Sequence, residues 1–136
     1  MANKWLFKEE PTHYSFSDFR KDGKTVWEGV KNPVAQKHLR QVKKGDSVFY
    51  YHTGKEKAVV GIAKAASNAY PDPKTKDGKS VVVDLVPVKA LPQPVTLASI
   101  KALATFKDFD LVRLPRLSVM PVTEGQWKKI ESMAEK

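Results

Sequence analysis

Aromatic side chains stand next to polar or basic ones at three points of the sequence. The segments are residues 27–32, which include Trp27 and Asn32, residues 50–52 (Tyr-Tyr-His) and residues 70–72 (Tyr-Pro-Asp). An aromatic face stacks on a nucleobase for about 1–3 kcal/mol per base. An amide or hydroxyl group beside it can read the polar edge of that base. These residue types predict a pocket for a base.

Core packing is the competing role for each aromatic side chain. We expect Trp5 and Trp127 to belong to the core, because each lies in an apolar pattern typical of a strand or helix. For Trp27 two roles stay open. It forms a stacking wall of the pocket, or it packs inside with its indole N–H bonded internally.

The charge indicates a polyanionic partner. The chain carries 24 Lys and Arg against 15 Asp and Glu, a formal net charge of +9. Basic domains bind nucleic acids by releasing counterions from phosphates, although a solubilising surface has the same composition. The expected contacts to a nucleic-acid backbone are Lys31, Lys37, Arg40, Lys43 and Lys44.

Catalytic and metal-binding patterns are missing from the sequence. His13, His38 and His52 lie far apart, and none has the spacing of a metal or nucleophile motif. There is no cysteine, hence no disulfide, zinc finger or thiol nucleophile. No GxSxG motif or P-loop is present. We therefore expect a binding protein without catalytic activity, metal or cofactor, in which His38 packs in the core.

The length of 136 residues predicts one domain over residues 1–136. Apolar residues make up 41% and charged residues 29%, as in ordinary globular proteins. No apolar run is long enough to span a membrane, and no signal peptide is expected. These features predict a soluble protein, cytoplasmic or nucleoid-associated in a bacterium and nuclear in a eukaryote.

Helix starts are marked by side chains that can cap a helix. Ser15, with Asp18 three positions later, predicts a capping box and a short helix that stops at Gly23. Asn32-Pro33 predicts the start of a second helix, which we expect to end at Gly45.

The same signals recur in the C-terminal third. Thr96 is expected to cap a short helix. Thr123 and Gln126 predict a second capping box, which opens a last helix with Trp127 toward the core.

Runs of β-branched and aromatic residues predict the strands. They are expected at residues 5–7, 47–52, 58–66, 80–88 and 117–122. Pro87 marks an edge or a bulge, and residues 70–73 are expected to be irregular because prolines stand two apart. The order of elements predicts an α+β fold, with a small curved sheet or partly closed barrel flanked by helices.

Four segments in order resemble the EVE domain of the PUA-like superfamily. They are residues 5–11 (WLFKEEP), 25–32 (TVWEGVKN), 48–52 (VFYYH) and 116–122 (RLSVMPV). The resemblance implies a PUA-like small mixed or antiparallel β-barrel with flanking helices. It also implies a non-catalytic reader that binds a modified nucleobase, either a modified cytosine in DNA or a modified base in RNA, after base flipping.

Further implications and one alternative accompany this resemblance. A nuclease or other effector partner is implied for bacterial relatives. The alternative function is a sensor of a free modified nucleoside or nucleotide, or of another small molecule. The sequence leaves the oligomeric state open.

The resemblance also places the ligand pocket on nine residues. They are Lys8, Glu10, Pro11, Trp27, Asn32, Tyr51, His52, Leu117 and Ser118. If Trp27 is a stacking wall, we expect it to share one concave pocket with Ser118 and the Tyr51-His52 pair.

Overall fold

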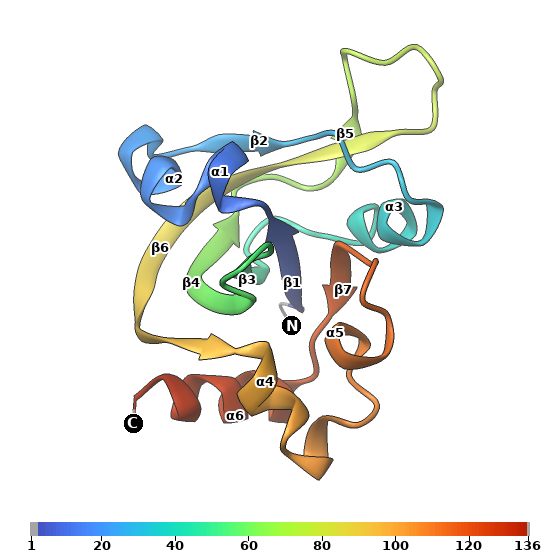
Figure 1. The fold of residues 1–136 in the computed structure, drawn as a ribbon. Coiled ribbons are helices and arrows are strands. Elements are labelled where there is room, and N and C mark those ends of the chain that lie inside the picture. The colour runs from blue at the N-terminus through green and yellow to red at the C-terminus, as the bar shows by residue number, and fades with distance from the viewer. Residues whose placement is uncertain (1–2, 136) are drawn as a thin grey trace.

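The computed structural model describes residues 3–135, and one strongly curved sheet forms its centre (Figure 1). The strand order is β2-β6-β4-β3-β1-β7, and β5 pairs with β6 outside this path. Strands β1 and β3 run parallel, and the other pairs are antiparallel. The strands are β1 (Lys4–Glu9), β2 (Thr25–Trp27), β3 (Ser47–His52), β4 (Ala58–Ala65), β5 (Tyr70–Pro71), β6 (Val81–Thr96) and β7 (Val119–Pro121).

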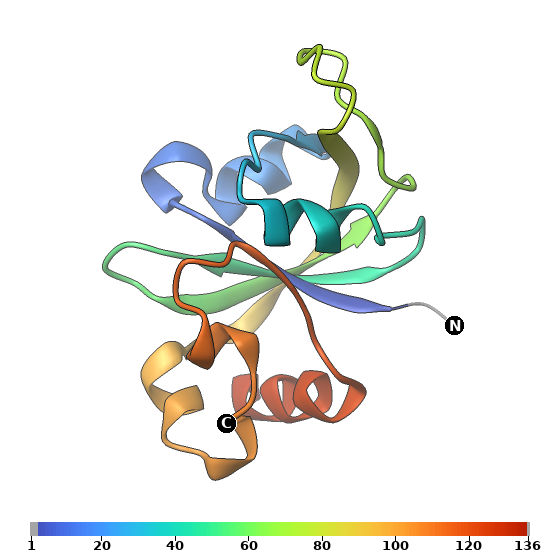
Figure 2. The ribbon, with the colours of Figure 1, turned by 90° about the vertical axis from the view of Figure 1, so that its right-hand side faces the viewer.

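Short helices cover both faces of this sheet. They are α1 (Pro11–Tyr14), α2 (Phe16–Asp22), α3 (Pro33–Leu39), α4 (Leu97–Lys101), the 3-10 helix η1 (Ala104–Phe106), α5 (Asp110–Arg113) and α6 (Glu124–Ala134). Figure 2 shows α1, α2 and α3 above the sheet and α4, α5 and α6 below it. The α+β fold with a curved mixed sheet and flanking helices is confirmed. Within residues 3–135, no helix is long and apolar enough to cross a bilayer.

The capping signals read from the sequence form as expected. Ser15 Oγ accepts the N–H of Asp18 at 3.0 Å, and the Asp18 carboxylate accepts the N–H of Ser15 at 3.3 Å. Thr123 and Gln126 make the same reciprocal pair before α6, at 3.1 and 3.0 Å. Gly23 ends α2 with a left-handed φ of 74°, a conformation that favours glycine.

Strand β6 is longer than the sequence indicates, since it continues past residue 88 to Thr96. Gly61 of β4 pairs with Ala90, and Val59 pairs with Val95, so one residue on β4 lies opposite four on β6 (residues 91–94). Pro92 and Pro94 fall in this unpaired stretch, where the ladder requires no N–H donor. The bulge thus lets a proline-rich strand continue around the barrel.

Helix α3 is shorter than expected, because it ends at Leu39 and not near Gly45. After it, the N–H groups of Gln41 and Val42 donate to carbonyls three residues earlier, as in a 3-10 turn. Two smaller corrections concern β7, which covers only residues 119–121, and the Tyr70–Pro71 segment, which pairs with β6 as β5 instead of being irregular.

Aromatic residues fill the core on both sides of the sheet. Below it, Trp127 of α6 stacks on Phe49 with ring centroids 3.6 Å apart. Above it, Phe16 packs edge-on against Tyr50 at 5.3 Å. A side chain at Gly61 would collide with the Phe16 ring. A larger residue at this position would therefore force the Phe16 ring to move where α2 meets β4.

Candidate functional site

The residues expected to form the pocket gather around the C-terminal end of β1. Lys8 pairs with Tyr51 of β3 in the parallel ladder. On the other side of β1, the backbone N–H of Lys8 donates to the Ser118 carbonyl at 2.9 Å. Three motifs that are distant in sequence thereby become neighbours. Three separate cavities border this region.

The first of these, the Trp27 cavity, has a volume of about 190 Å³ and lies beside α1 and β2. It is lined by Glu9, His13, Tyr14, Thr25, Val26, Trp27 and Glu28. An aromatic wall, two carboxylates and hydroxyl groups thus surround one small space. That combination is suited to a flat ligand with a polar edge.

Trp27 has features of both roles that the sequence left open. Its side chain is 6% exposed and packs against Phe7 at 5.4 Å and Tyr50 at 5.5 Å between ring centroids. Its indole N–H has no acceptor within residues 3–135, yet no buried side-chain nitrogen or oxygen there lacks a partner. The indole nitrogen is therefore not fully buried, the ring packs in the core, and Trp27 also lines the cavity.

The polar groups of the Trp27 cavity are held by specific contacts. Glu9 Oε1 accepts the N–H of Glu10 at 2.9 Å and lies 3.2 Å from Nδ1 of His13. The Glu28 carboxylate pairs with Lys74 at 3.0 Å. The Tyr14 hydroxyl donates to Asp22 at 2.7 Å, and burial together with that bond raises the pKa of Tyr14. The cavity lining therefore combines two carboxylates with the tryptophan side chain.

The second cavity, the Asn32 cavity, has a volume of about 290 Å³ and is mostly apolar. It is lined by Asn32, Val34, Leu114, Pro115, Arg116 and Leu117. Val34 and Leu114 are 48% and 39% exposed, which is unusual for large apolar side chains.

Asn32 itself has a structural role beside this cavity. Its Oδ1 accepts the N–H groups of Val34 and Ala35 at 2.8 and 3.1 Å and so caps α3. Its amide NH₂ is the group left to face a ligand.

The third cavity, the Lys8 cavity, has a volume of about 260 Å³ and lies between the β3–β4 turn and helices α4 and α5. Lys8 and Tyr51 line it together. Burial lowers the pKa of Lys8 and raises the pKa of Tyr51 to about 12. Lys8 Nζ donates to the Pro115 carbonyl at 3.0 Å, and Pro115 lines both this cavity and the Asn32 cavity.

Several expected ligand residues hold the protein together at this end of the sheet. His52 is 8% exposed, its Nε2 accepts the N–H of Phe16 at 3.0 Å, and its Nδ1 lies 2.7 Å from Glu56. Glu10 accepts the Thr53 hydroxyl at 3.3 Å. Pro11 begins α1.

The single shared pocket expected from the sequence is divided in the structure. Trp27 lines one cavity, Tyr51 another, and Leu117 a third. Sequence reasoning also missed Glu28 and His13. Glu28 directly follows Trp27, and His13 lies in α1, close to the end of β1 that carries Glu9.

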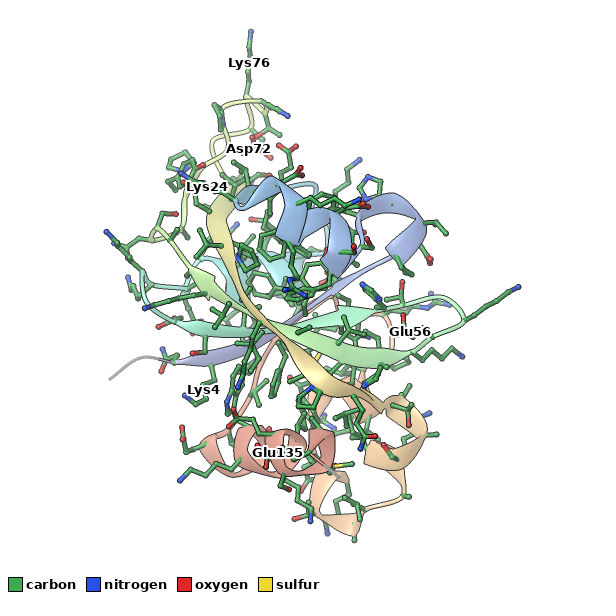
Figure 3. All side chains as sticks on the ribbon, turned by 90° about the vertical axis from the view of Figure 1, so that its left-hand side faces the viewer. Lys4, Lys24, Glu56, Asp72, Lys76 and Glu135 are labelled. Carbon is green, nitrogen blue, oxygen red and sulfur yellow. The ribbon has the colours of Figure 1, made fainter. Side chains whose placement is uncertain are left out.

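The basic residues expected to grip phosphates are exposed. Lys37 lies on α3, while Arg40, Lys43 and Lys44 follow it because the helix ends early. None of these, nor Lys31, forms an ion pair within the described part of the chain. Arg40 donates to the Lys79 carbonyl at 3.0 Å. That bond ties the turn to a projecting lysine-rich loop, in which Figure 3 marks Lys76.

A larger cavity of about 540 Å³ lies elsewhere, between η1 and α6. It is lined by residues of the 103–105 and 123–129 segments and contains none of the expected ligand residues. The chemistry read from the sequence therefore lies at the β1 end of the sheet.

Comparisons with solved structures reveal close relatives. An NMR structure of a Rhodopseudomonas palustris protein is 40% identical with a TM-score of 0.94, and the match covers 98% of this chain and 94% of the other. The crystal structure of human THYN1 protein in complex with 5-methylcytosine-containing DNA is 28% identical with a TM-score of 0.91, covering 99% of each chain. The ASCH structure from Zymomonas mobilis, at 12% identity and a TM-score of 0.59, shares the fold alone.

Sequence comparison agrees with the structures. Human thymocyte nuclear protein 1 is 28% identical over 170 residues, which cover 100% of this chain and 76% of the relative. The EVE domain family matches residues 3–133. The resemblance drawn from four short segments is confirmed, and the chain belongs to the EVE domain family.

Proposed function

We propose that this protein is a non-catalytic reader of DNA that carries a modified cytosine, and that the modified base occupies the Trp27 cavity. The observation that carries the proposal is the likeness to human THYN1 protein, whose structure contains 5-methylcytosine DNA and matches over 99% of each chain. The chemistry of the Trp27 cavity supports this assignment independently.

The edge of a cytosine presents an amino donor at N4 and acceptors at N3 and O2. In the Trp27 cavity, the carboxylates of Glu9 and Glu28 accept from the amino group, and the indole N–H of Trp27 donates to the ring acceptors. Val26, 41% exposed, supplies an apolar surface for a methyl group. Burial of a methyl contributes about 0.8 kcal/mol, so methylation by itself raises affinity about fourfold.

A base inside a duplex reaches such a cavity only after it is flipped out of the stack, at a cost of a few kcal/mol. Contacts between cations and phosphates offset this cost. The exposed residues Lys31, Lys37, Arg40, Lys43 and Lys44 supply such cations along α3 and the turn that follows it. These cations favour a polymer over a free nucleoside, which needs no phosphate contacts.

Fluorescence anisotropy with two duplexes tests the proposal. The duplexes differ in one cytosine, methylated in one and unmodified in the other, and free 5-methylcytidine serves as competitor. We expect the methylated duplex to bind several-fold more tightly and the nucleoside to compete only weakly. Equal affinity for both duplexes contradicts the proposal. Competition by the nucleoside as strong as by the duplex favours the sensor of a free nucleoside.

A charge-matched pair of variants locates the base. Glu28→Gln keeps the shape of the side chain but removes its charge, and we expect about a fivefold loss of affinity for the methylated duplex. The ion pair with Lys74 is exposed and contributes little to stability. Glu135→Gln removes one negative charge just beyond the end of α6, below the sheet (Figure 3), and is expected to leave affinity unchanged. Equal effects of both variants contradict the placement of the base.

A further inference from the structure

All charged residues that line the Lys8 cavity are cationic. Three of its ten lining residues are lysines, namely Lys8, Lys57 and Lys101, and none of the ten is acidic. A concave surface with several cations and no anion concentrates field lines and attracts anionic ligands. The rest of the lining includes the Thr53 hydroxyl, the Tyr51 side chain and apolar side chains of α4 and α5.

Lys8 is held in place inside this cavity. Its Nζ donates to the Pro115 carbonyl at 3.0 Å and lies 5.7 Å from the centre of the Tyr51 ring. An ammonium group has three donors, so further N–H groups remain for a ligand. Burial lowers the pKa of Lys8 because the charged form is partly desolvated, and an anion bound beside it would compensate that loss.

The turn that contains Lys57 also has an unusual backbone conformation, which a hydrogen bond to α4 holds in place. Lys57 has a φ of 46°, the one left-handed non-glycine residue within residues 3–135. Its carbonyl accepts the N–H of Leu97 at 2.7 Å, which fixes the turn against the start of α4. Strained backbone of this kind persists where the surroundings hold it and is frequent at ligand sites.

Glu56, within this turn, pairs with His52 at 2.7 Å, and Glu10 contacts the turn from outside it. Its carboxylate accepts the Thr53 hydroxyl at 3.3 Å and lies 2.8 Å from where a Cβ on Gly54 would stand. Glu10 does not line the cavity, and it forms no ion pair with the three lysines among the described residues. The positive lining is therefore not neutralised from this side.

We propose that the Lys8 cavity is a site for the phosphate of a nucleotide, separate from the cavity that we assign to the base. The three ammonium groups bind the phosphate, and the apolar side chains of α4 and α5 pack against the sugar. The phosphate belongs to a DNA strand or to a free mononucleotide, which present the same chemistry. The volume of about 260 Å³ exceeds what a phosphate group alone needs, which favours a phosphate attached to a sugar.

NMR titration of the isotope-labelled full chain tests the site with three probes: 2′-deoxycytidine 5′-monophosphate, 2′-deoxycytidine and a short unmethylated duplex. We expect the monophosphate, the duplex or both to shift amide signals of residues 53–57 and 97–101, and the unphosphorylated nucleoside to leave them unchanged. Shifts with the monophosphate identify a free nucleotide as a ligand, and shifts with the duplex alone identify the DNA backbone. The absence of shifts with every probe, or equal shifts with the nucleoside, overturns the proposal.

Two matched variants separate this site from general electrostatics. Lys101→Gln removes a lining cation, and we expect about a fivefold loss of affinity for the probe that binds, equivalent to roughly 1 kcal/mol. Lys55→Gln removes the same charge from the β3–β4 turn, outside the lining, and is expected to leave affinity within the error of measurement. Equal losses in both variants overturn the proposal. Because all probes are unmethylated, this outcome is independent of the discrimination between methylated and unmodified cytosine.

Discussion

Replacement of Trp27 by alanine tests how the structure divides this residue between core and cavity. Its side chain is 6% exposed and packs against Phe7 and Tyr50. Removal of a buried tryptophan costs about 3–5 kcal/mol, which combines lost transfer free energy with the cavity left behind. For a domain of this size, each kcal/mol lowers the melting temperature by about 4 °C. We therefore expect Trp27→Ala to melt roughly 10–20 °C below the wild type.

The assay combines thermal unfolding with binding of the methylated duplex to the fraction that remains folded. Trp27→Phe is the matched variant, since it keeps an aromatic ring in the core but lacks the indole N–H. We expect it to retain most of the stability and to lose affinity for the methylated duplex. A change of less than about 1 kcal/mol in Trp27→Ala would refute the core placement, because exposed positions show effects of that size. Unchanged affinity in Trp27→Phe would remove the indole from the base site.

Further substitutions probe separate features of the fold and its surface. Asn32→Ala removes both hydrogen bonds that cap α3, and chemical denaturation should show a loss of about 1 kcal/mol. Gly61→Ala forces the Phe16 ring to move, and a loss of at least about 1 kcal/mol is expected on the same assay; no loss would mean that α2 shifts freely. The double variant Lys43→Gln, Lys44→Gln should reduce the slope of log affinity against log salt for a duplex without changing base preference. Because burial lowers the pKa of Lys8, this cation loses its proton at a lower pH than an exposed lysine. Affinity for the monophosphate should therefore fall as the pH rises through that range. The same pH dependence in Lys8→Met as in the wild type would contradict this explanation.

Local hydrogen bonds could be predicted from the sequence where both partners are near neighbours in the chain. The Ser15 and Thr123 capping boxes need only residues three positions apart, so their residue types suffice to predict them. The main strands follow from β-branched and aromatic runs in the same way. The ordered segments that begin with residues 5–11 were sufficient to indicate the EVE domain family, because each reflects a constraint of the same fold.

The ends of elements depended on contacts that the sequence does not display. The continuation of β6 through Pro92 and Pro94 depends on a bulge opposite β4, and a bulge is a property of two strands. The early end of α3 accompanies a bond from the N–H of Lys43 to the buried Asp46. That carboxylate also accepts the indole N–H of Trp5 at 2.9 Å.

The candidate site shows the same division between residue type and placement. The sequence indicated aromatic, amide and basic groups for a nucleic-acid ligand, and the structure distributes them over three cavities and over the surface of α3 and the turn after it. Only the tertiary structure decided which of them face a cavity. Both ring nitrogens of His52 contact Phe16 and Glu56. Glu28, which no sequence motif indicated, lines the cavity beside Trp27. A side chain's type fixes the bonds it can make, but the packing of distant segments fixes which bonds remain for a ligand.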